Sequence, residues 1–236
     1  MNELRREIDR MLSEIPITYG GGCSVDKAYA MAWMIRRYQL RTTLDIGVYM
    51  GRSLFPQAIA HRRCTGGVAY GVDPWAAAAA EQRDMPEYKE LLERFVRETD
   101  FEAVYGEVER LRNKWSLEKH CVLIRETSEA AAQYFAERDI EFDLIHIDGN
   151  HDTKMVSRDV ELYVPRLREG GFLFMDDVTW PSVRPAYERV CASLQHVYER
   201  VKRSRGDDYA VFRRSRSKLR LAALRTAFHL QVHSYR

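Results

Sequence analysis

The fold is decided by residues 142–180, which read FDLIHIDGNHDTKMVSRDVELYVPRLREGGFLFMDDVTW. An apolar run over 142–147 ends in Asp148, and a turn follows it. Residues 154–169 have helical spacing, and a second apolar run over 170–175 ends in two further carboxylates. The pattern predicts a strand, a helix and a second strand that runs parallel to the first.

Three carboxylates follow the two predicted strands, namely Asp148, Asp176 and Asp177. Parallel strands joined by a helix end at the same edge of a sheet, where open α/β sheets bind ligands. We therefore expect these carboxylates to meet at one rim, with His151 beside them. Carboxylates at such short separation repel one another unless a positive charge lies between them. A hard divalent cation, Mg²⁺ or Mn²⁺, is the predicted occupant.

The bulk composition fits one globular domain, since 45% of the 236 residues are hydrophobic and 31% are charged. No run approaches the ~20 apolar residues that a spanning helix needs, so no membrane span is expected. The amphipathic, acid-bearing N-terminus does not resemble a signal peptide. The four cysteines lie far apart without a C-x-x-C pair, which favours buried free thiols and a cytoplasmic location.

Charge is distributed unevenly along the chain. From Arg200 to the C-terminus there are eleven Lys or Arg residues and two Asp residues, whereas the rest of the chain is acidic. Such a basic tail is typical of a solvated helix face or an oligomer contact, with nucleic-acid or membrane contact as the alternative. The tail also has a helical apolar stripe at Leu221, Leu224, Phe228, Val232 and Tyr235.

A second glycine-rich unit begins earlier in the chain. Residues 42–47 form a short β-branched run, and residues 47–53, GVYMGRS, lead into a helical segment that ends near His61. Glycines let the backbone approach a ligand closely, and a helix N-terminus offers free N–H groups. Another predicted strand over 67–72 ends in Asp73, a position from which a carboxylate binds both ribose hydroxyls of a nucleotide.

Together these segments resemble class I S-adenosylmethionine (SAM)-dependent methyltransferases. The resemblance is carried by LDIGVYMGRS (44–53), GVDPW (71–75), IDGNH (147–151) and GGFLFMDD (170–177), in the order of that family. It spans about residues 42–213 and is closest to the metal-dependent O-methyltransferases of catechols and antibiotic sugars. The implied fold is a Rossmann-like α/β domain with seven strands, helices on both faces and a final antiparallel hairpin.

The resemblance also implies roles for individual residues. Residues implied to bind SAM are Asp45, Gly47, Tyr49, Gly51, Ser53, Asp73, Trp75, Ser128 and Asp148. Asp148, Asp176 and Asp177 are implied to hold the metal, and His151 is expected to accept the proton of the acceptor hydroxyl at a near-neutral pKa. His151 as a metal ligand or helix cap, Trp75 as a packing residue and Ser128 as a helix cap remain alternatives. His146 is expected to point away from the rim as a packed core residue.

Three regions complete the predicted organisation. Residues 1–40 are expected to form a helical cap or lid with a glycine loop at 20–22, residues 41–214 the SAM-binding domain, and residues 215–236 a basic amphipathic helix. The charged, helical insertion at 76–119 either shapes the substrate pocket or simply covers the domain. Thr127, Ser128 and Glu129 are suited to cap the helix that follows the third strand.

We therefore expect a SAM-dependent, metal-assisted O-methyltransferase of natural-product biosynthesis. Its acceptor would be a small molecule such as a sugar hydroxyl, a vicinal diol or a catechol-like group. A homo-oligomer is expected, and nucleic acid is disfavoured because no Asn/Asp-Pro-Pro-Tyr type motif follows the fourth strand. The alternatives are a related metal-dependent tailoring enzyme and a non-catalytic SAM-binding protein that acts through a partner.

Overall fold

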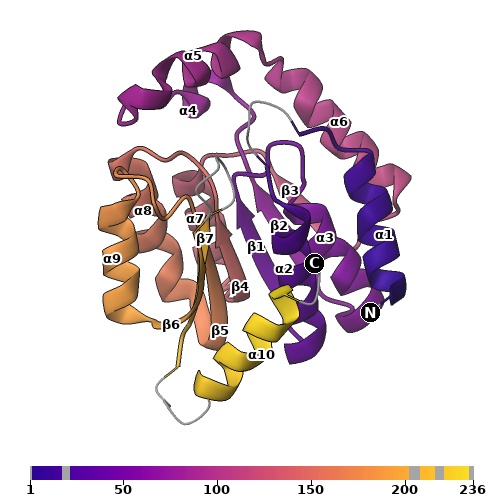
Figure 1. The fold of residues 1–236 in the computed structure, drawn as a ribbon. Helices are drawn as coiled ribbons and strands as arrows, with labels where there is room; N and C mark the ends of the chain where they lie inside the picture. Colours follow the sequence, from indigo (N-terminus) through magenta and orange to yellow (C-terminus); the bar gives the residue numbers. More distant parts are fainter. Residues whose placement is uncertain (1, 18–21, 202–207, 216–220, 234–236) are drawn as a thin grey trace.

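The computed structural model describes residues 2–17, 22–201, 208–215 and 221–233. Within these ranges the chain forms a seven-stranded sheet in the order β3-β2-β1-β4-β5-β7-β6 (Figure 1). The strands are β1 (Thr42–Ile46), β2 (Val68–Val72), β3 (Cys121–Ile124), β4 (Phe142–Ile147), β5 (Leu167–Asp176), β6 (Gln195–Arg200) and β7 (Tyr209–Arg213). Strands β1 to β5 pair in parallel, and β7 is antiparallel to both β5 and β6. The predicted Rossmann-like sheet with a final antiparallel hairpin is confirmed.

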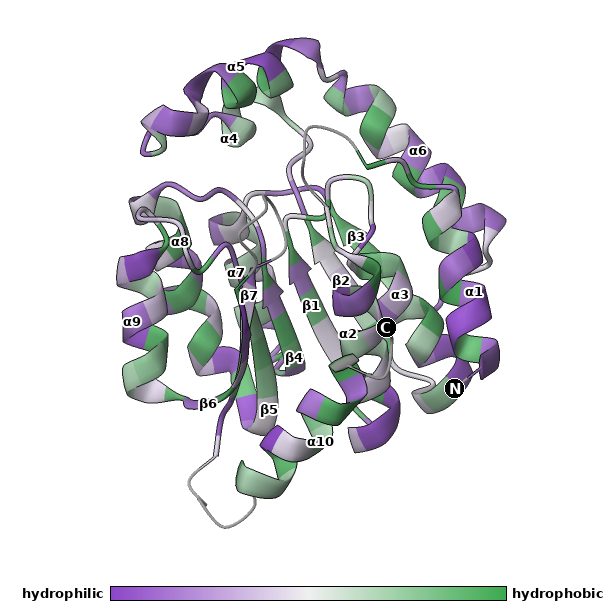
Figure 2. Cartoon of the chain, in the orientation of Figure 1, coloured by the Kyte–Doolittle hydropathy of each residue, from purple (hydrophilic) through white to green (hydrophobic). Residues whose placement is uncertain are grey.

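Helices cover both faces of the sheet. On one face lie α1 (Asn2–Ser13), α2 (Val25–Tyr38), α3 (Leu54–Ala60) with the adjoining turn η1 (His61–Thr65), and α10 (Leu221–His233). On the other lie α7 (Ser128–Glu137), α8 (Thr153–Tyr163) and α9 (Arg184–Ser193). Each face has its own apolar core, and in Figure 2 much of the central sheet is green while the outer helix surfaces carry much of the purple. The alternation of side chains along each strand supplies both cores.

A third group of helices lies over the edge where the parallel strands end. It comprises α4 (Ala77–Ala80), the turn η2 (Pro86–Tyr88), α5 (Lys89–Glu98) and α6 (Phe101–Lys114), which arch over that edge in Figure 1. None of the residues of α5 is buried, although its apolar stripe faces inward to a cavity. The helical insertion predicted at 76–119 is therefore present and stands above the rim.

One predicted boundary is wrong. The helix expected over 154–169 ends at Tyr163, and the turn η3 (Val164–Arg166) leads directly into β5. Pro165 explains the early end, because proline lacks the N–H that an interior helical position needs and its ring clashes with the preceding turn. Residues 167–169, expected in the helix, belong to β5, which pairs with β4 from Leu167 onward.

The ends of the chain pack on the sheet. Helix α10 lies within the predicted segment 215–236, of which 216–220 and 234–236, with Tyr235 of the predicted stripe, lie outside the described residues. Leu224, Phe228 and Val232 are buried in the same core as α2. Of the predicted glycine loop, Gly20 and Gly21 lie outside the described residues, as do 206 and 207 of the predicted hairpin turn. The division into 1–40, 41–214 and 215–236 stays a prediction. Among the described residues, no helix is long and apolar enough to cross a membrane.

Candidate active site

The loop after β1 approaches the neighbouring strand unusually closely. Gly47 has φ 86° and Gly51 has φ 84°, and Tyr49 between them also has a positive φ of 46°. A Cβ on Gly47 would collide with the backbone carbonyl of Asp148. Such strained backbone persists only where the surroundings hold it, and it is common at ligand sites. The loop therefore brings the ends of β1 and β4 together at the rim.

Asp73 fixes this loop from the end of β2. Its Oδ2 accepts a hydrogen bond from the Tyr49 N–H at 2.9 Å, and its Oδ1 accepts one from the Trp75 N–H at 2.7 Å. Burial raises the pKa of Asp73, while these backbone donors oppose the rise. A carboxylate oxygen has two lone pairs, so each oxygen of Asp73 can still accept one ligand hydroxyl.

One cavity of about 600 Å³ runs along the rim beneath the α4–α6 arch. The predicted site residues that line it are Gly47, Tyr49, Ser53, Asp73, Ser128, Asp148, His151, Asp176 and Asp177. The structure thus brings the predicted cofactor motif and the predicted catalytic residue into a single space. The upper wall is apolar and includes Leu91, Leu92 and Phe95 of α5.

Three predicted cofactor residues lie behind the cavity wall. Gly51 contributes its backbone to the turn and Trp75 is buried, with its Nε1 donating to the Tyr49 carbonyl at 2.8 Å and its ring packed on Tyr105 of α6. Asp45 is fully buried, and its carboxylate contacts the His146 Nδ1 at 2.7 Å and the Gln57 Nε2 at 3.3 Å. For Trp75 this position favours the packing alternative.

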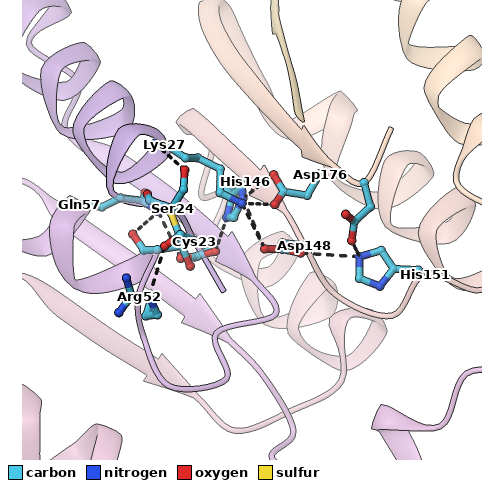
Figure 3. A network of polar contacts seen from close by, with 12 residues as sticks. Cys23, Ser24, Lys27, Arg52, Gln57, His146, Asp148, His151 and Asp176 are labelled. Carbon is cyan, nitrogen blue, oxygen red and sulfur yellow. Dashed lines mark hydrogen bonds and ion pairs between the residues drawn. The ribbon is translucent and has the colours of Figure 1, made fainter. Parts of the chain in front are cut away.

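Two of the three predicted carboxylates, Asp148 and Asp177, meet at His151. Its Nε2 lies 2.9 Å from Asp177 Oδ2 and 3.6 Å from Asp148 Oδ1. Figure 3 shows Asp148 between His151 and the other charged side chains. The imidazole packs against the Trp180 ring, with centroids 4.9 Å apart, and Trp180 stacks in turn on Tyr88. Burial lowers the pKa of His151, but Asp177 and Asp148 outweigh it and raise the pKa to about 10. The expectation of a near-neutral pKa does not hold for this site without ligand.

The prediction for His146 is wrong. Its side chain is buried as expected, but it points into the carboxylate cluster, with Nε2 3.2 Å from Asp176 Oδ1 and 3.9 Å from Asp148 Oδ2. Residues two apart on a strand face the same side, so the alternation that aims Asp148 at the rim aims His146 there too. Burial lowers the pKa of His146, but Asp45 and Asp176 outweigh it and raise the pKa to about 10.

Lys27 was missed by the sequence analysis. It lies in the first turn of α2, which Ser24 caps by accepting a hydrogen bond from the Lys27 N–H at 3.2 Å. Its side chain is 2% exposed, and its Nζ donates to Asp176 Oδ2 and lies 3.6 Å from Asp148 Oδ2. The sequence does contain an indication of this role. Lys27, Met31 and Met34 are spaced i, i+4, i+7 and so lie on one face of the helix, and a lysine on such an apolar face is buried only when it is paired with an acidic group.

The cap of α7 also differs from expectation. Thr127 is the N-cap residue, with its Oγ1 accepting from the Ala130 N–H at 3.3 Å. Ser128 is the first helical residue and lines the cavity, and its carbonyl accepts from the Tyr163 hydroxyl at 2.6 Å. The capping role weighed for Ser128 therefore belongs to its neighbour, and the role of Ser128 toward a cofactor stays a prediction.

Solved structures similar to this one include O-methyltransferases. The chain superimposes on an O-methyltransferase from Bacillus cereus in complex with SAH (TM-score 0.61, 14% identity, 90% of this chain and 91% of that one). It superimposes equally on TomG from Streptomyces achromogenes, an O-methyltransferase of tomaymycin synthesis bound to SAM (TM-score 0.62, 12% identity, 90% of each chain). At these identities the likeness shows a shared fold.

The family is shown by a sequence match. No curated protein matches the chain in sequence. Residues 44–178, more than half of the chain, match the family model described as a methyltransferase domain. This range contains every motif that carries the resemblance, together with the cavity-lining residues Gly47, Asp73 and His151. Metal dependence stays a prediction, whereas the resemblance to SAM-dependent methyltransferases is confirmed, and the chain belongs to the methyltransferase domain family.

Proposed function

We propose that the protein transfers the methyl group of SAM to a hydroxyl group of a small molecule. The observation that carries the proposal is the single cavity that joins Gly47, Tyr49 and Asp73 to His151. The first three residues suit a nucleoside cofactor, and His151 suits proton transfer. SAM- or SAH-bound O-methyltransferases of the same fold support the choice of cofactor and of oxygen as the acceptor atom.

The reaction is a displacement in line with the sulfonium. The acceptor oxygen forms a bond to the methyl carbon while the bond from that carbon to sulfur breaks, and SAH leaves. The hydroxyl proton passes to the imidazole of His151, which can accept it only in its neutral form. Although burial lowers it, Asp177 and Asp148 raise the pKa of His151 to about 10, so the neutral fraction, and with it the rate, should rise with pH toward that value. Neither ring nitrogen has a hydrogen-bond partner among the described residues, but Nε2 lies 2.9 Å from Asp177 Oδ2, so we assign proton acceptance to Nδ1. Asp177 then stabilises the imidazolium, and the cavity holds the reactants in contact.

The side chains that line the cavity indicate which class of acceptor molecule it can bind. Leu91, Leu92 and Phe95 of α5 and the stacked pair of Tyr88 and Trp180 line it. An apolar or aromatic molecule buries surface against these side chains, whereas a sugar would leave its hydroxyls without partners there. Among the acceptors considered from the sequence, we therefore favour a catechol-like compound over a natural-product sugar or a vicinal diol.

Metal assistance is the remaining part of the hypothesis drawn from the sequence. A divalent cation supplies this chemistry by lowering the pKa of a bound hydroxyl. The donor atoms of Asp148, His151 and Asp177, and those of His146, Asp148 and Asp176, are grouped closely enough for an ion. However, both oxygens of Asp176 already contact the side chains of Lys27 and His146. The side chains as arranged do not fit a divalent cation at Asp176, so the reaction above contains no step that requires one.

Cofactor binding is tested by calorimetric titration with SAH. We expect micromolar binding, about −8 kcal/mol, by the wild type. Asp73→Asn should weaken it at least about tenfold, because the ribose hydroxyls lose a charged acceptor. Asp139→Asn, an exposed carboxylate on another loop, is the matched control and should bind as the wild type does. Absence of binding by the wild type would overturn the proposed cofactor.

The catalytic role of His151 is tested in an acceptor screen with labelled SAM. His151→Asn should lower methyl transfer by about 10²–10⁴-fold, the usual contribution of a general base, while SAH binding stays within about threefold of the wild type. His229→Asn, on the exposed face of α10, is the control. Full activity in the His151 variant would rule out this residue as the base.

A further inference from the structure

The side chains at the rim form an unbroken series of alternating charges. Asp45 contacts His146, which contacts Asp176, which contacts Lys27. Figure 3 shows His146, Asp176 and Lys27 together. The series continues through three further groups, with Lys27 Nζ near Asp148, Asp148 near His151, and His151 near Asp177. Among the described residues, four carboxylates are thus linked by one ammonium and two imidazoles.

Lys27 holds the central place in this series. Its Nζ lies between Asp176 Oδ2 and Asp148 Oδ2, two of the three carboxylates that the sequence assigns to a divalent cation. The third, Asp177, has His151 Nε2 at 2.9 Å. Every carboxylate of the predicted metal site therefore has a nitrogen of this chain as its neighbour.

The charges make the ammonium hard to displace. The Lys27 side chain is 2% exposed, and its Nζ donates to Asp176 Oδ2 with Asp148 Oδ2 3.6 Å away. The other oxygen of Asp176 contacts His146 Nε2, so both oxygens of this carboxylate are occupied. A divalent ion that entered would leave the Lys27 ammonium buried beside a second cation, and an uncompensated buried charge is strongly unfavourable.

We propose that the Lys27 ammonium takes the place of the divalent cation between Asp148 and Asp176, so that the protein binds no such ion there and transfers the methyl group without one. The binding part of this proposal stands on the side-chain geometry, and the catalytic part rests on the proposed function. Lys27 is a positioning residue in this scheme. It neutralises Asp148 and Asp176, which border the cavity, and leaves proton transfer to His151.

Mn²⁺ binding tests the proposal without an acceptor. Free Mn²⁺ is followed by electron paramagnetic resonance in the presence of SAH. The wild type should bind no stoichiometric ion at about 1 mM Mn²⁺, the weak end of protein cation sites. Lys27→Met removes the charge at similar volume and should create one site that binds Mn²⁺ at least about tenfold more tightly. Adding Asp148→Asn to that variant should remove the site again.

Control experiments distinguish failure of the Lys27 proposal from failure of the proposed function. Lys119→Met, at an exposed lysine before β3, should behave as the wild type. One tight Mn²⁺ per wild-type chain that Asp148→Asn abolishes would overturn the proposal, and this result needs no folded Lys27 variant. A folded Lys27→Met protein that still binds no Mn²⁺ would overturn it as well. Absence of SAH binding would contradict the proposed function but not the proposal for Lys27, because Mn²⁺ binding is measured separately.

Methyl transfer gives a second readout once an acceptor is found. The wild type should keep its rate within about twofold after treatment with a chelator, whereas metal-assisted catalysis would lose nearly all of it. The Lys27→Met protein should be slow in chelator, and added Mn²⁺ should restore part of its rate. Rescue of this kind distinguishes a charge role from a merely structural one, since an ion cannot repair a packing defect.

Discussion

At the scale of single residues, the buried carboxyl group of Asp159, which lines the cavity, makes the free energy of unfolding depend on pH. It is 4% exposed and its Oδ1 has no hydrogen-bond partner among the described residues. Burial raises the pKa of Asp159 from 3.8 to about 7. Between these two pH values the folded state binds a proton that the unfolded state has lost, so this group lowers the free energy of unfolding as the pH rises, by about 1.4 kcal/mol per unit.

Asp159→Asn should therefore stabilise the protein, and the gain should depend on pH. Asparagine is neutral at every pH, so the difference from the wild type should be small near pH 4 and grow to about 4 kcal/mol by pH 8. Urea unfolding of both proteins across this range measures it. A difference that stays constant with pH would show that the folded-state pKa of Asp159 is ordinary.

Residue types and spacing predicted part of the site and missed part of it. Asp148, Asp176, Asp177 and His151 were predicted because each follows a strand of one parallel sheet. Lys27 was not, since it is 149 positions from Asp176 in the sequence and only packing of α2 on the sheet brings the two together. A contact of that separation leaves no local pattern beyond a lysine on an apolar helix face.

At the scale of elements, the helical arch is fastened to the rim by a small set of hydrogen bonds. Asn150 Nδ2 donates to the carbonyls of Ala79 and Glu81 at 3.0 and 2.7 Å. Asp152 Oδ1 accepts from the N–H groups of Arg83 and Asp84 at 2.7 and 2.9 Å. The turn between β4 and α8 thus holds the loop after α4, which forms one wall of the cavity.

Asp152→Ala should loosen this wall. It removes a charged acceptor of two backbone hydrogen bonds, each worth about 1.5–3 kcal/mol. We expect the amides of Arg83 and Asp84 to exchange with deuterium at least about tenfold faster, and SAH to dissociate faster by a similar factor. Glu118→Ala, outside the cavity, is the control. Unchanged exchange at both amides would mean that the wall is held by other contacts.

Elements were easier to predict than their ends. The strand–helix–strand unit follows from apolar runs and helical spacing, which local sequence displays. The boundary between α8 and β5 was placed too late, because the charged residues 166–169 read as a continued helix although Pro165 precedes them. Strand β5 begins at Leu167 because it pairs with β4 there. Pairing between strands depends on tertiary structure, so the hydrophobic period of the sequence does not reveal it.

At the scale of the whole molecule, the strand order explains why the site forms where it does. The order reverses between β1 and β4, which pair side by side with the end of each at the cavity. Open α/β sheets bind ligands at such a reversal. The motifs in the sequence predicted this sheet, whereas the arrangement of the outer helices, and with it the lysine of α2, required the packed structure.

Helix α10 closes the core on the face that carries Lys27. Phe228 is fully buried, and its ring lies 4.9 Å from that of Tyr198, 6.1 Å from that of Trp33 and 6.2 Å from that of Phe174. These partners belong to β6, α2 and β5, so one side chain joins the end of the chain to its beginning and middle. The basic helix is therefore part of the domain, whatever its outer face contacts.

Phe228→Ala should consequently act as a core mutation although it lies near the C-terminus. The lost transfer free energy and the resulting cavity should lower the free energy of unfolding by about 3–5 kcal/mol. Leu230→Ala, on the same helix but 65% exposed, is the matched control and should change it by no more than about 0.5 kcal/mol. Urea unfolding of both variants decides the matter. Equal stability would show that α10 does not belong to the cooperative core.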